Sequence, residues 1–525
     1  MNVANSEAFD NPRSTPADRQ FAAAKYASEM IDSIASQLKI NIVTAVQRGE
    51  SFDQTERSAR NAAFQIGNQA LEFFIQLQGN GDLGPEIATE QGKILRRSAT
   101  TTRTTIRSIF GMHCFDQFTY APAAKKATQL LPISARMLLP KWQWSYLLQE
   151  FSQMMAIDQS YDQAMNNLGT ILGTTFSVDT AENINAEIGK EASAFLDDLP
   201  KPAPDSEAQL LVVSADCKGV PLVKVDAAKV AAFETAKKNP GNRRMATVAS
   251  VYTVEPHVRT AEEITAALFR DEPDESATKI KRPRPQNKNT TAHFPETQDD
   301  GDGGTIAITG IHVAMAWIIG QVLARRRSGQ VLIALMDGQE SLWETMKMHL
   351  TFSTRTVPIL DILHALAYVW EAASLFEKED KQRKAFTRER LLRILRGDVK
   401  GVISGLRRMG TTHKLSGKAA EDLARICGYL EKNSDRMRYE EYLRRGYPIA
   451  SGVIEGACRH LVKDRMERSG MRWTLEGARS MLHVRATFQS DHWRAFLDHR
   501  IKCEAQLNHP HREILGDYQP FTLAC

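Results

Sequence analysis

AQLLVVSADCKGVPLVKVD, residues 208–226, is the stretch that decides the fold predicted for this chain. Two apolar runs lie on either side of Gly219, and a Val-rich run follows in MATVASVYTV, residues 245–254. Short apolar runs rich in β-branched residues and broken by glycine are typical of buried strands. We therefore expect three consecutive antiparallel strands here, with a turn at Gly219 between the first two.

Two further strands are expected after an apolar helix over residues 306–327. QVLIALMDG (330–338) and TVPILDILH (356–364) are mostly apolar along their whole length, as strands of a parallel sheet are when both faces are buried. A helix-like segment separates them, which gives β-α-β order. From 364 to about 446 the chain is charged with helical periodicity, so an all-helical insertion is expected. The predicted class is α/β.

The length of the chain predicts several domains, because 525 residues exceed the roughly 250 to 300 at which one core stops growing. The Pro-rich segment DLPKPAPDSEA (198–208) is the expected linker. We divide the chain into an N-terminal helical region (1–99), a small strand-rich element (100–140), a helix-turn-helix-like DNA-binding region (141–197), the first part of the catalytic core (205–370), a helical insertion (371–446), the last part of the core (447–500) and a tail (501–525).

The regions before the linker carry the candidate elements for recognising DNA. Helices are expected over 17–78, and a hairpin or small sheet over the Thr-, Ile- and Phe-rich residues 100–122. Within 141–190 we expect a helix, a glycine-containing turn and a second helix, which Ser177 or Asp179 caps. Its Asn183, Asn185 and Glu187 would face outward toward bases or phosphates. The alternative, a plain pair of core helices, stays open.

Composition and charge narrow the classes of protein. An apolar fraction of 42% and a charged fraction of 25% are typical of soluble proteins, and a formal charge of +4 permits a DNA partner without requiring one. The six cysteines form no CxxC pair, so we expect neither a zinc ribbon nor a disulfide framework. No signal-like or membrane-spanning apolar run is found, which favours a cytoplasmic protein without membrane insertion.

Three acids form the candidate catalytic constellation. Asp216 and Asp337 each end an apolar run and are followed within three residues by glycine, so both carboxylates are expected at one edge of the sheet. Two magnesium ions about 3.5 to 4 Å apart need such rigid acidic oxygens around a scissile phosphate. Acids at strand ends also serve as turn formers and helix caps. The third acid, Glu455, begins the helical segment SGVIEGACRHLVKDRMERSGMRW (451–473).

That segment also carries the candidate DNA-binding cations. At helical spacing Glu455, Arg459 and Lys463 share a face, and the plain explanation of this spacing is a helical ion pair between the first two. A dense basic run after a glycine-bracketed acid instead favours a metal ligand beside phosphate-binding groups. The predicted DNA-binding residues are Lys218, Arg459, Lys463, Arg465, Arg468, Arg472 and Trp473, although burial is the commoner outcome for a tryptophan. The basic run KIKRPRP (279–285) is a further candidate contact.

Four motifs resemble those of the ISKra family of insertion-sequence transposases: SADCKGV (214–220), LIALMDGQESLW (332–343), ILDILHALAYVWEAA (359–373) and GYPIASGVIEGACRHLVKDRMERSGMRW (446–473). The resemblance covers about 205–490. It implies a ribonuclease H-like core that binds two Mg²⁺ ions, or Mn²⁺, through Asp216, Asp337 and Glu455. It also implies binding to transposon ends and target DNA, as a homodimer or higher oligomer.

Other positions complete or weaken the resemblance. Asp361 and His364 match a D-x-x-H element of related transposases, where they are expected to orient the ligands. Asp361 is the rival of Asp337 as second ligand. Cys217 stands where the family usually has glycine, and residues 118–132 lack the cysteines of a zinc element that relatives often carry.

The sequence thus predicts a bacterial DNA transposase that hydrolyses and rejoins phosphodiester bonds. Two alternatives remain at this point. One is a transposon-derived DNA-binding protein that no longer cuts, and the other is a metal-dependent DNA nuclease.

Overall fold

The computed structural model describes residues 16–123, 126–231, 241–270, 282–299, 301–302, 304–350, 356–468 and 470–521. The chain is a mixed α/β protein, as its sequence predicts. It divides into two compact units. The first contains the described residues up to Ile184 and those from Arg494 onward, and the second spans Asn185–Trp493. No helix of the described residues is long and apolar enough to cross a membrane.

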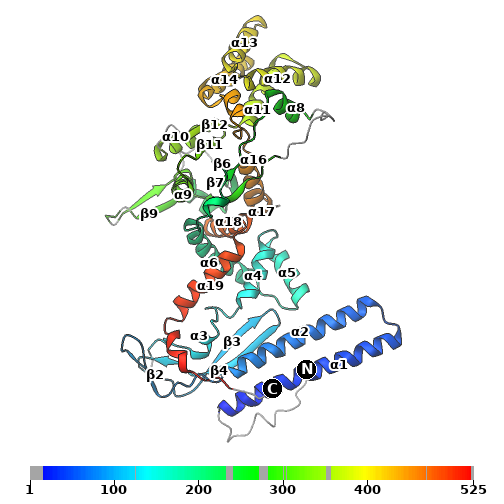
Figure 1. Ribbon diagram of the computed structural model, residues 1–525, viewed down its shortest axis with the longest axis vertical. Helices are drawn as coiled ribbons and strands as arrows, with labels where there is room; N and C mark the ends of the chain where they lie inside the picture. The colour runs from blue at the N-terminus through cyan, green and yellow to red at the C-terminus, as the bar shows by residue number, and fades with distance from the viewer. Residues whose placement is uncertain are drawn as a thin grey trace. The chain divides into compact units, whose positions relative to one another are not determined.

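The first unit begins with a long helical hairpin, drawn in blue in Figure 1. It is formed by α1 (Pro16–Arg48) and α2 (Phe52–Leu77), which confirms the helices predicted over 17–78. Ser51 sets the start of α2 through a capping box, because its hydroxyl accepts the Gln54 N–H at 3.3 Å while the Gln54 side chain accepts the Ser51 N–H at 2.9 Å.

Short strands and helices complete the first unit. The hairpin predicted within 100–122 is confirmed as β3 (Thr102–Ser108) and β4 (Gly111–Gln117). A second small sheet has the order β1-β2-β5. Its strands are β1 (Glu86–Ala88), β2 (Ile94–Arg97) and β5 (Tyr120–Ala121), and the remaining elements are α3 (Pro132–Arg136), α4 (Tyr146–Ala156), α5 (Tyr161–Leu172), α19 (Trp493–Asn508) and η4 (Arg512–Asp517).

The helix, glycine turn and helix expected within 141–190 are confirmed as α5 and α6 (Val178–Asp197). Gly173 ends α5 with a φ of 68°, a left-handed conformation that glycine adopts without strain. Ser177 caps α6, since its hydroxyl accepts the Thr180 N–H at 3.2 Å. The outward orientation expected for Asn185 is wrong. This side chain is 1% exposed because it lies on the apolar stripe of α6, whereas Asn183 is exposed.

A five-stranded mixed sheet with the order β12-β11-β6-β7-β8 forms the centre of the second unit. Strands β6, β7 and β8 pair antiparallel, and β11 and β12 continue the sheet in parallel with β6. The strands are β6 (Leu210–Pro221), β7 (Arg243–Val254), β8 (Gln286–His293), β11 (Val331–Met336) and β12 (Thr356–Leu360). Three antiparallel strands and a β-α-β unit were both expected.

The turn predicted at Gly219 is wrong. β6 runs without interruption through Gly219 to Pro221 and pairs with β7 along its whole length, because Val220 beyond the glycine is fully buried. MATVASVYTV is therefore the second strand and not the third. The third strand, β8, has the polar sequence QNKNTTAH, which carries no run of apolar residues by which it could be found.

Helices cover both faces of this sheet, which explains why its central strands are apolar at nearly every position. Alternate residues of β6, such as Leu211 and Val212, enter two different cores. One core includes α9 (Gly310–Arg325), the helix predicted over 306–327, and α10 (Glu340–His349). The other includes α11 (Ile362–Phe376) and four helices from 380 to 444: α12 (Asp380–Leu395), α13 (Val399–Thr412), α14 (Gly417–Lys432) and α15 (Tyr439–Arg444).

The chain then returns to the sheet through a second group of short elements. They are α16 (Gly452–Ala457), the π-helical turn η3 (Cys458–Lys463), α17 (Asp464–Met466) and α18 (Leu475–Gln489). The remaining elements are α7 (Lys224–Ala231), α8 (Ala261–Phe269), the strands β9 (Glu296–Asp299) and β10 (Thr305–Ile308), and the single turns η1 (Pro204–Ser206) and η2 (Ser434–Arg436).

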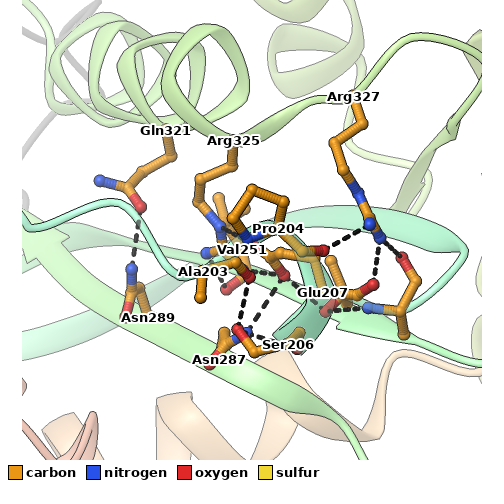
Figure 2. Close-up of polar contacts among 12 residues, drawn as sticks. Ala203, Pro204, Ser206, Glu207, Val251, Asn287, Asn289, Gln321, Arg325 and Arg327 are labelled. Carbon is orange, nitrogen blue, oxygen red and sulfur yellow. Dashed lines mark hydrogen bonds and ion pairs between the residues drawn. The ribbon is translucent and has the colours of Figure 1, made fainter.

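A buried ion pair fixes the start of β6 against α9 and β7 (Figure 2). The Arg325 Nε lies 2.8 Å from Glu207 Oε1, and each side chain is only 2% exposed. The Thr253 hydroxyl donates to Glu207 Oε2 at 2.7 Å, and the Asn287 amide reaches the same oxygen at 3.3 Å. Burial would raise the pKa of Glu207, but the hydrogen bonds from Arg325 and Thr253 outweigh it, so the pKa is lowered.

We expect Glu207→Ala to destabilise the protein by about 3–5 kcal/mol, because it leaves the Arg325 guanidinium buried without its counter-charge. Urea denaturation gives this difference in the free energy of unfolding. Glu431→Ala is the control, since it removes an exposed partner of Arg407 in the same unit and should leave stability unchanged. Equal stability of both variants would show that the buried pair does not hold β6.

Candidate metal centre

The register of the parallel strands brings three aspartates to one level of the sheet. Ala334 of β11 pairs with Val213 of β6, and Met336 of β11 pairs with Leu360 of β12. Continuing both registers places Asp337 between Asp216 and Asp361. Side chains at equivalent positions of neighbouring parallel strands point to the same face, so these carboxylates lie in one row. The sequence predicted the meeting of Asp216 and Asp337. It wrongly placed Asp216 at a strand end, because β6 continues to Pro221.

Asp361 is the most constrained of the three. It is fully buried and caps α11 by accepting the Leu363 N–H on Oδ1 at 2.8 Å. Its other oxygen accepts the Ser451 N–H at 3.3 Å and also the Ser451 hydroxyl. The His364 Nδ1 lies 3.6 Å from this same oxygen. Asp361 thereby ties the end of β12 to the residue that precedes α16.

Glu455 reaches the row of aspartates from α16. One ligand atom each from Asp361, His364 and Glu455 lie within 4.8 Å of one another, a spacing that a metal ion can bridge. At the other end of the same helix the Cys458 thiol donates to Asp216 Oδ2 at 3.3 Å. The segment from Ser451 to Cys458 therefore touches both ends of the row.

Backbone N–H groups donate to one oxygen of Asp216 and one oxygen of Asp337. The Cys217 N–H donates to Asp216 Oδ1 at 2.6 Å, and the Gln339 N–H donates to Asp337 Oδ1 at 2.9 Å. The donors lie one residue after Asp216 and two residues after Asp337, so the adjacent backbone orients these carboxylates.

Negative charge at this centre is not balanced by basic side chains. Burial raises the pKa of Asp337, and the neighbouring Asp216 and Asp361 raise it further. Burial and the charge of Asp361 likewise raise the pKa of Glu455. In the part of the chain that the structure describes, none of the four carboxylates forms an ion pair with lysine or arginine.

These residues fit a divalent cation. Carboxylate oxygens are the ligands that Mg²⁺ and Mn²⁺ prefer, and imidazole is an accepted ligand of Mn²⁺ and other transition ions. His364 Nδ1 has no hydrogen-bond partner among the described residues and lies 3.6 Å from Asp361 Oδ2. A cation between the acids would relieve their mutual repulsion.

The predicted DNA-binding residues divide into exposed and buried groups. Arg459, Lys463, Arg468 and Arg472 are exposed, and Lys218 is half-buried on β6. Arg465 is fully buried, with its guanidinium 4.6 Å from the ring centre of Trp473, which is 7% exposed. Burial leaves both side chains without access to a DNA strand, so the contact expected from these two residues is not supported.

The helical face expected for Glu455, Arg459 and Lys463 is also altered. The π-helical turn begins at Cys458, so α-helical spacing does not continue beyond Ala457. Arg459 lies 3.8 Å from Asp464 instead of pairing with Glu455. Glu455 therefore forms no helical ion pair with Arg459 and lies beside Asp361 and His364.

Three residues at this centre were not identified from the sequence. Ser451 and Cys458 lie in a quoted motif, but their contacts join positions 90 and 242 residues apart. Tyr429 of α14 is the third. Its buried hydroxyl has no hydrogen-bond partner, and a Cβ on Gly338 would lie 2.4 Å from it. Burial, Tyr368 and Asp337 raise the pKa of Tyr429, which shows that the helical insertion reaches the acids.

The sequence matches no protein-family model, and no curated protein is similar to it at a significant level. The chemistry of the centre is therefore argued from its own residues.

We expect Asp337→Asn to stabilise the metal-free protein and to abolish its stabilisation by Mn²⁺. The variant removes one charge from the repelling row, which should raise the melting temperature by about 1–3 °C. A bound ion stabilises the wild type by RT ln(1 + [ion]/Kd), which grows with the logarithm of the ion concentration above Kd, and this increment should disappear in the variant. Differential scanning fluorimetry with and without Mn²⁺ measures both effects.

The pH dependence of the stability difference between the wild type and Asp337→Asn tests whether charge repulsion causes it. Because the pKa of Asp337 is raised in the folded state, the metal-free wild type loses stability as the pH rises above the unfolded pKa near 3.8. The stability advantage of the variant should consequently be larger at pH 7 than at pH 4. Asp435→Asn, which neutralises an exposed acid of the same unit, should change neither measurement. An advantage that does not vary with pH would contradict charge repulsion in this row.

Proposed function

We propose that this protein is a DNA transposase that cleaves and rejoins phosphodiester bonds through Asp216, Asp337 and Glu455. The observation that carries the proposal is the row of Asp216, Asp337 and Asp361 at one level of neighbouring parallel strands, joined by Glu455 and without lysine or arginine counter-charges. Such a row suits two divalent cations, which is the requirement of metal-assisted phosphoryl transfer. The likeness to ISKra transposases supports the same assignment.

A ribonuclease H-like core is part of the proposal. The mixed sheet supports it, because three antiparallel strands are followed by a parallel β-α-β unit and the acids gather where the parallel strands end. Helices on both faces leave that edge accessible. The helices from 380 to 444 correspond to the insertion expected between the second acid and Glu455.

Each group of residues has a defined task in this reaction. Two bound Mg²⁺ or Mn²⁺ ions would activate water or a 3′ hydroxyl and stabilise the leaving oxygen. Asp216, Asp337 and Glu455 supply the carboxylates that hold them. Asp361 and His364 orient the ligands, and the exposed cations Arg459, Lys463, Arg468 and Arg472 attract the phosphate backbone. No covalent protein intermediate is needed, since positioning and charge neutralisation suffice for in-line displacement.

The remaining regions complete the proposed protein. The pair α5 and α6 would contribute to recognition of the element's ends, with Asn183 and Glu187 as candidate contacts. We infer a dimer or larger assembly on DNA, because two ends must be held for strand transfer.

We expect Asp337→Asn and Glu455→Gln to abolish Mg²⁺-dependent cleavage and strand transfer while leaving the binding of end DNA nearly intact. His364→Ala should slow the reaction by about 10–100-fold, as removal of a ligand-orienting residue does. Purified protein with DNA that contains the sequences flanking the reading frame gives both readouts. Arg445→Gln is the control, because it removes an exposed partner of Glu441 and none of the carboxylates of the centre.

The outcome also decides between the two candidate second ligands. If His364→Ala and Asp361→Asn abolish the reaction while Asp337→Asn does not, the metal belongs to Asp361, His364 and Glu455. Cleavage without strand transfer would identify a nuclease, and binding without cleavage would identify a transposon-derived DNA-binding protein.

A further inference from the structure

A cleft of about 640 Å³ lies on the other side of the helix that carries Glu455. One wall is α16 with the start of η3, and the other is the edge strand β8 with the residues that precede it. Gly452, Gly456 and His460 line the cleft, whereas Glu455 lies beside Asp361 and the Cys458 thiol donates to Asp216. The cleft is therefore separate from the metal centre but shares a wall with it.

The wall formed by α16 is unusually open. Gly452 and Gly456 have no left-handed backbone, and a Cβ at either position would meet no atom within 4 Å. Glycine inside a helix costs about 0.5–1 kcal/mol relative to alanine. Neither backbone strain nor packing accounts for these two glycines, so the space above them is available to a ligand.

The opposite wall offers unpaired positive charge. Arg284 and Lys288 line the cleft and are exposed, and neither forms an ion pair or side-chain hydrogen bond with the described residues. Arg284 belongs to the basic run KIKRPRP, of which residues 279–281 lie outside the described residues. Asp491 is the one carboxylate among the described lining residues.

The lining is suited to a sugar-phosphate backbone. The Gln489 amide in the lining can donate to phosphate and sugar oxygens, whereas the amides of Asn287 and Asn289 already donate to Ser206 and Gln321. The described lining contains no phenylalanine, tyrosine or tryptophan on which bases could stack. Its volume lies in the range of pockets for drug-sized molecules, roughly 300–1,000 Å³. Such a volume admits a short segment of one strand and excludes a duplex.

We propose that this cleft binds the backbone of a single nucleic-acid strand, with Arg284 and Lys288 contacting its phosphates. The proposal rests on the proposed function in taking DNA as the substrate, and it adds the place where an unpaired segment is held. That segment lies across α16 from the reacting phosphate, so binding there positions DNA without touching the metal ligands.

The first test is the salt dependence of binding to a fluorescent oligothymidylate of about 20 nucleotides. Fluorescence anisotropy of the full chain in EDTA removes cleavage from the measurement. Arg284→Gln with Lys288→Gln should lower the affinity by about 10- to 30-fold at about 0.1 M salt and reduce the slope of log K against log[salt] by about 1.4. Arg284→Lys with Lys288→Arg keeps both charges and should retain the slope.

A steric variant tests the cleft itself. A Cβ at position 456 would meet no protein atom within 4 Å, so for Gly456→Leu we expect thermal stability to be preserved while the affinity for the single strand falls more than about tenfold. Gly428→Leu is the matched control, since Gly428 is also helical and a Cβ there would also meet no atom within 4 Å, but it lies on α14. A duplex of the same length should lose little affinity in the Gly456 variant.

Failure of this proposal differs from failure of the proposed function. Unchanged single-strand binding in the glutamine and leucine variants, or an equal loss of duplex binding, overturns the cleft as a single-strand site even if Mg²⁺-dependent cleavage is present. The expected losses in a protein that never cleaves DNA would support the cleft and refute the transposase.

Discussion

Repulsion among carboxylates held in one row is the constraint on which the site depends. The parallel register of β6, β11 and β12 puts Asp216, Asp337 and Asp361 side by side, and no local freedom of the chain can separate them. The protein offsets this cost with neutral donors from the backbone, from Ser451 and from Cys458, and leaves the net charge in place. An arrangement that is unfavourable for folding and retains its charge is typical of a site that binds a cation.

The rest of the second unit makes this row rigid. Two separate cores clamp the faces of the sheet, so the central strands cannot shift relative to each other without exposing apolar side chains on both sides. At the opposite end of β6, the buried pair of Glu207 and Arg325 fixes the strand against α9. Asp216 lies in the middle of β6, so the pair fixes the start of the strand that carries this acid.

The sequence predicted the features that depend on residues adjacent in the chain. It did not predict the features that depend on contacts between distant residues. Apolar runs identified β6, β7, β11 and β12, and the acids were found because they directly follow such runs. Strand β8 was not predicted, because most of its buried side chains are polar. The turn at Gly219 was predicted wrongly, because a glycine within a long strand cannot be told from a turn glycine by its neighbours in the sequence. Ser451, Cys458 and Tyr429 could not be found, because only the folded chain brings them to the acids. The burial of Arg465 against Trp473 was hidden for the same reason.

The π-helical turn over Cys458–Lys463 has a consequence for how this segment can vary. A π turn accommodates one more residue than the α-helix it interrupts, and such turns are frequent at functional sites. Removing a single residue there would restore regular winding and rotate everything downstream by about a quarter turn. Trp473, downstream of the turn, would then be displaced from Leu222, with which it forms a β-bridge. The segment Cys458–Lys463 therefore tolerates substitutions better than it tolerates a change of length.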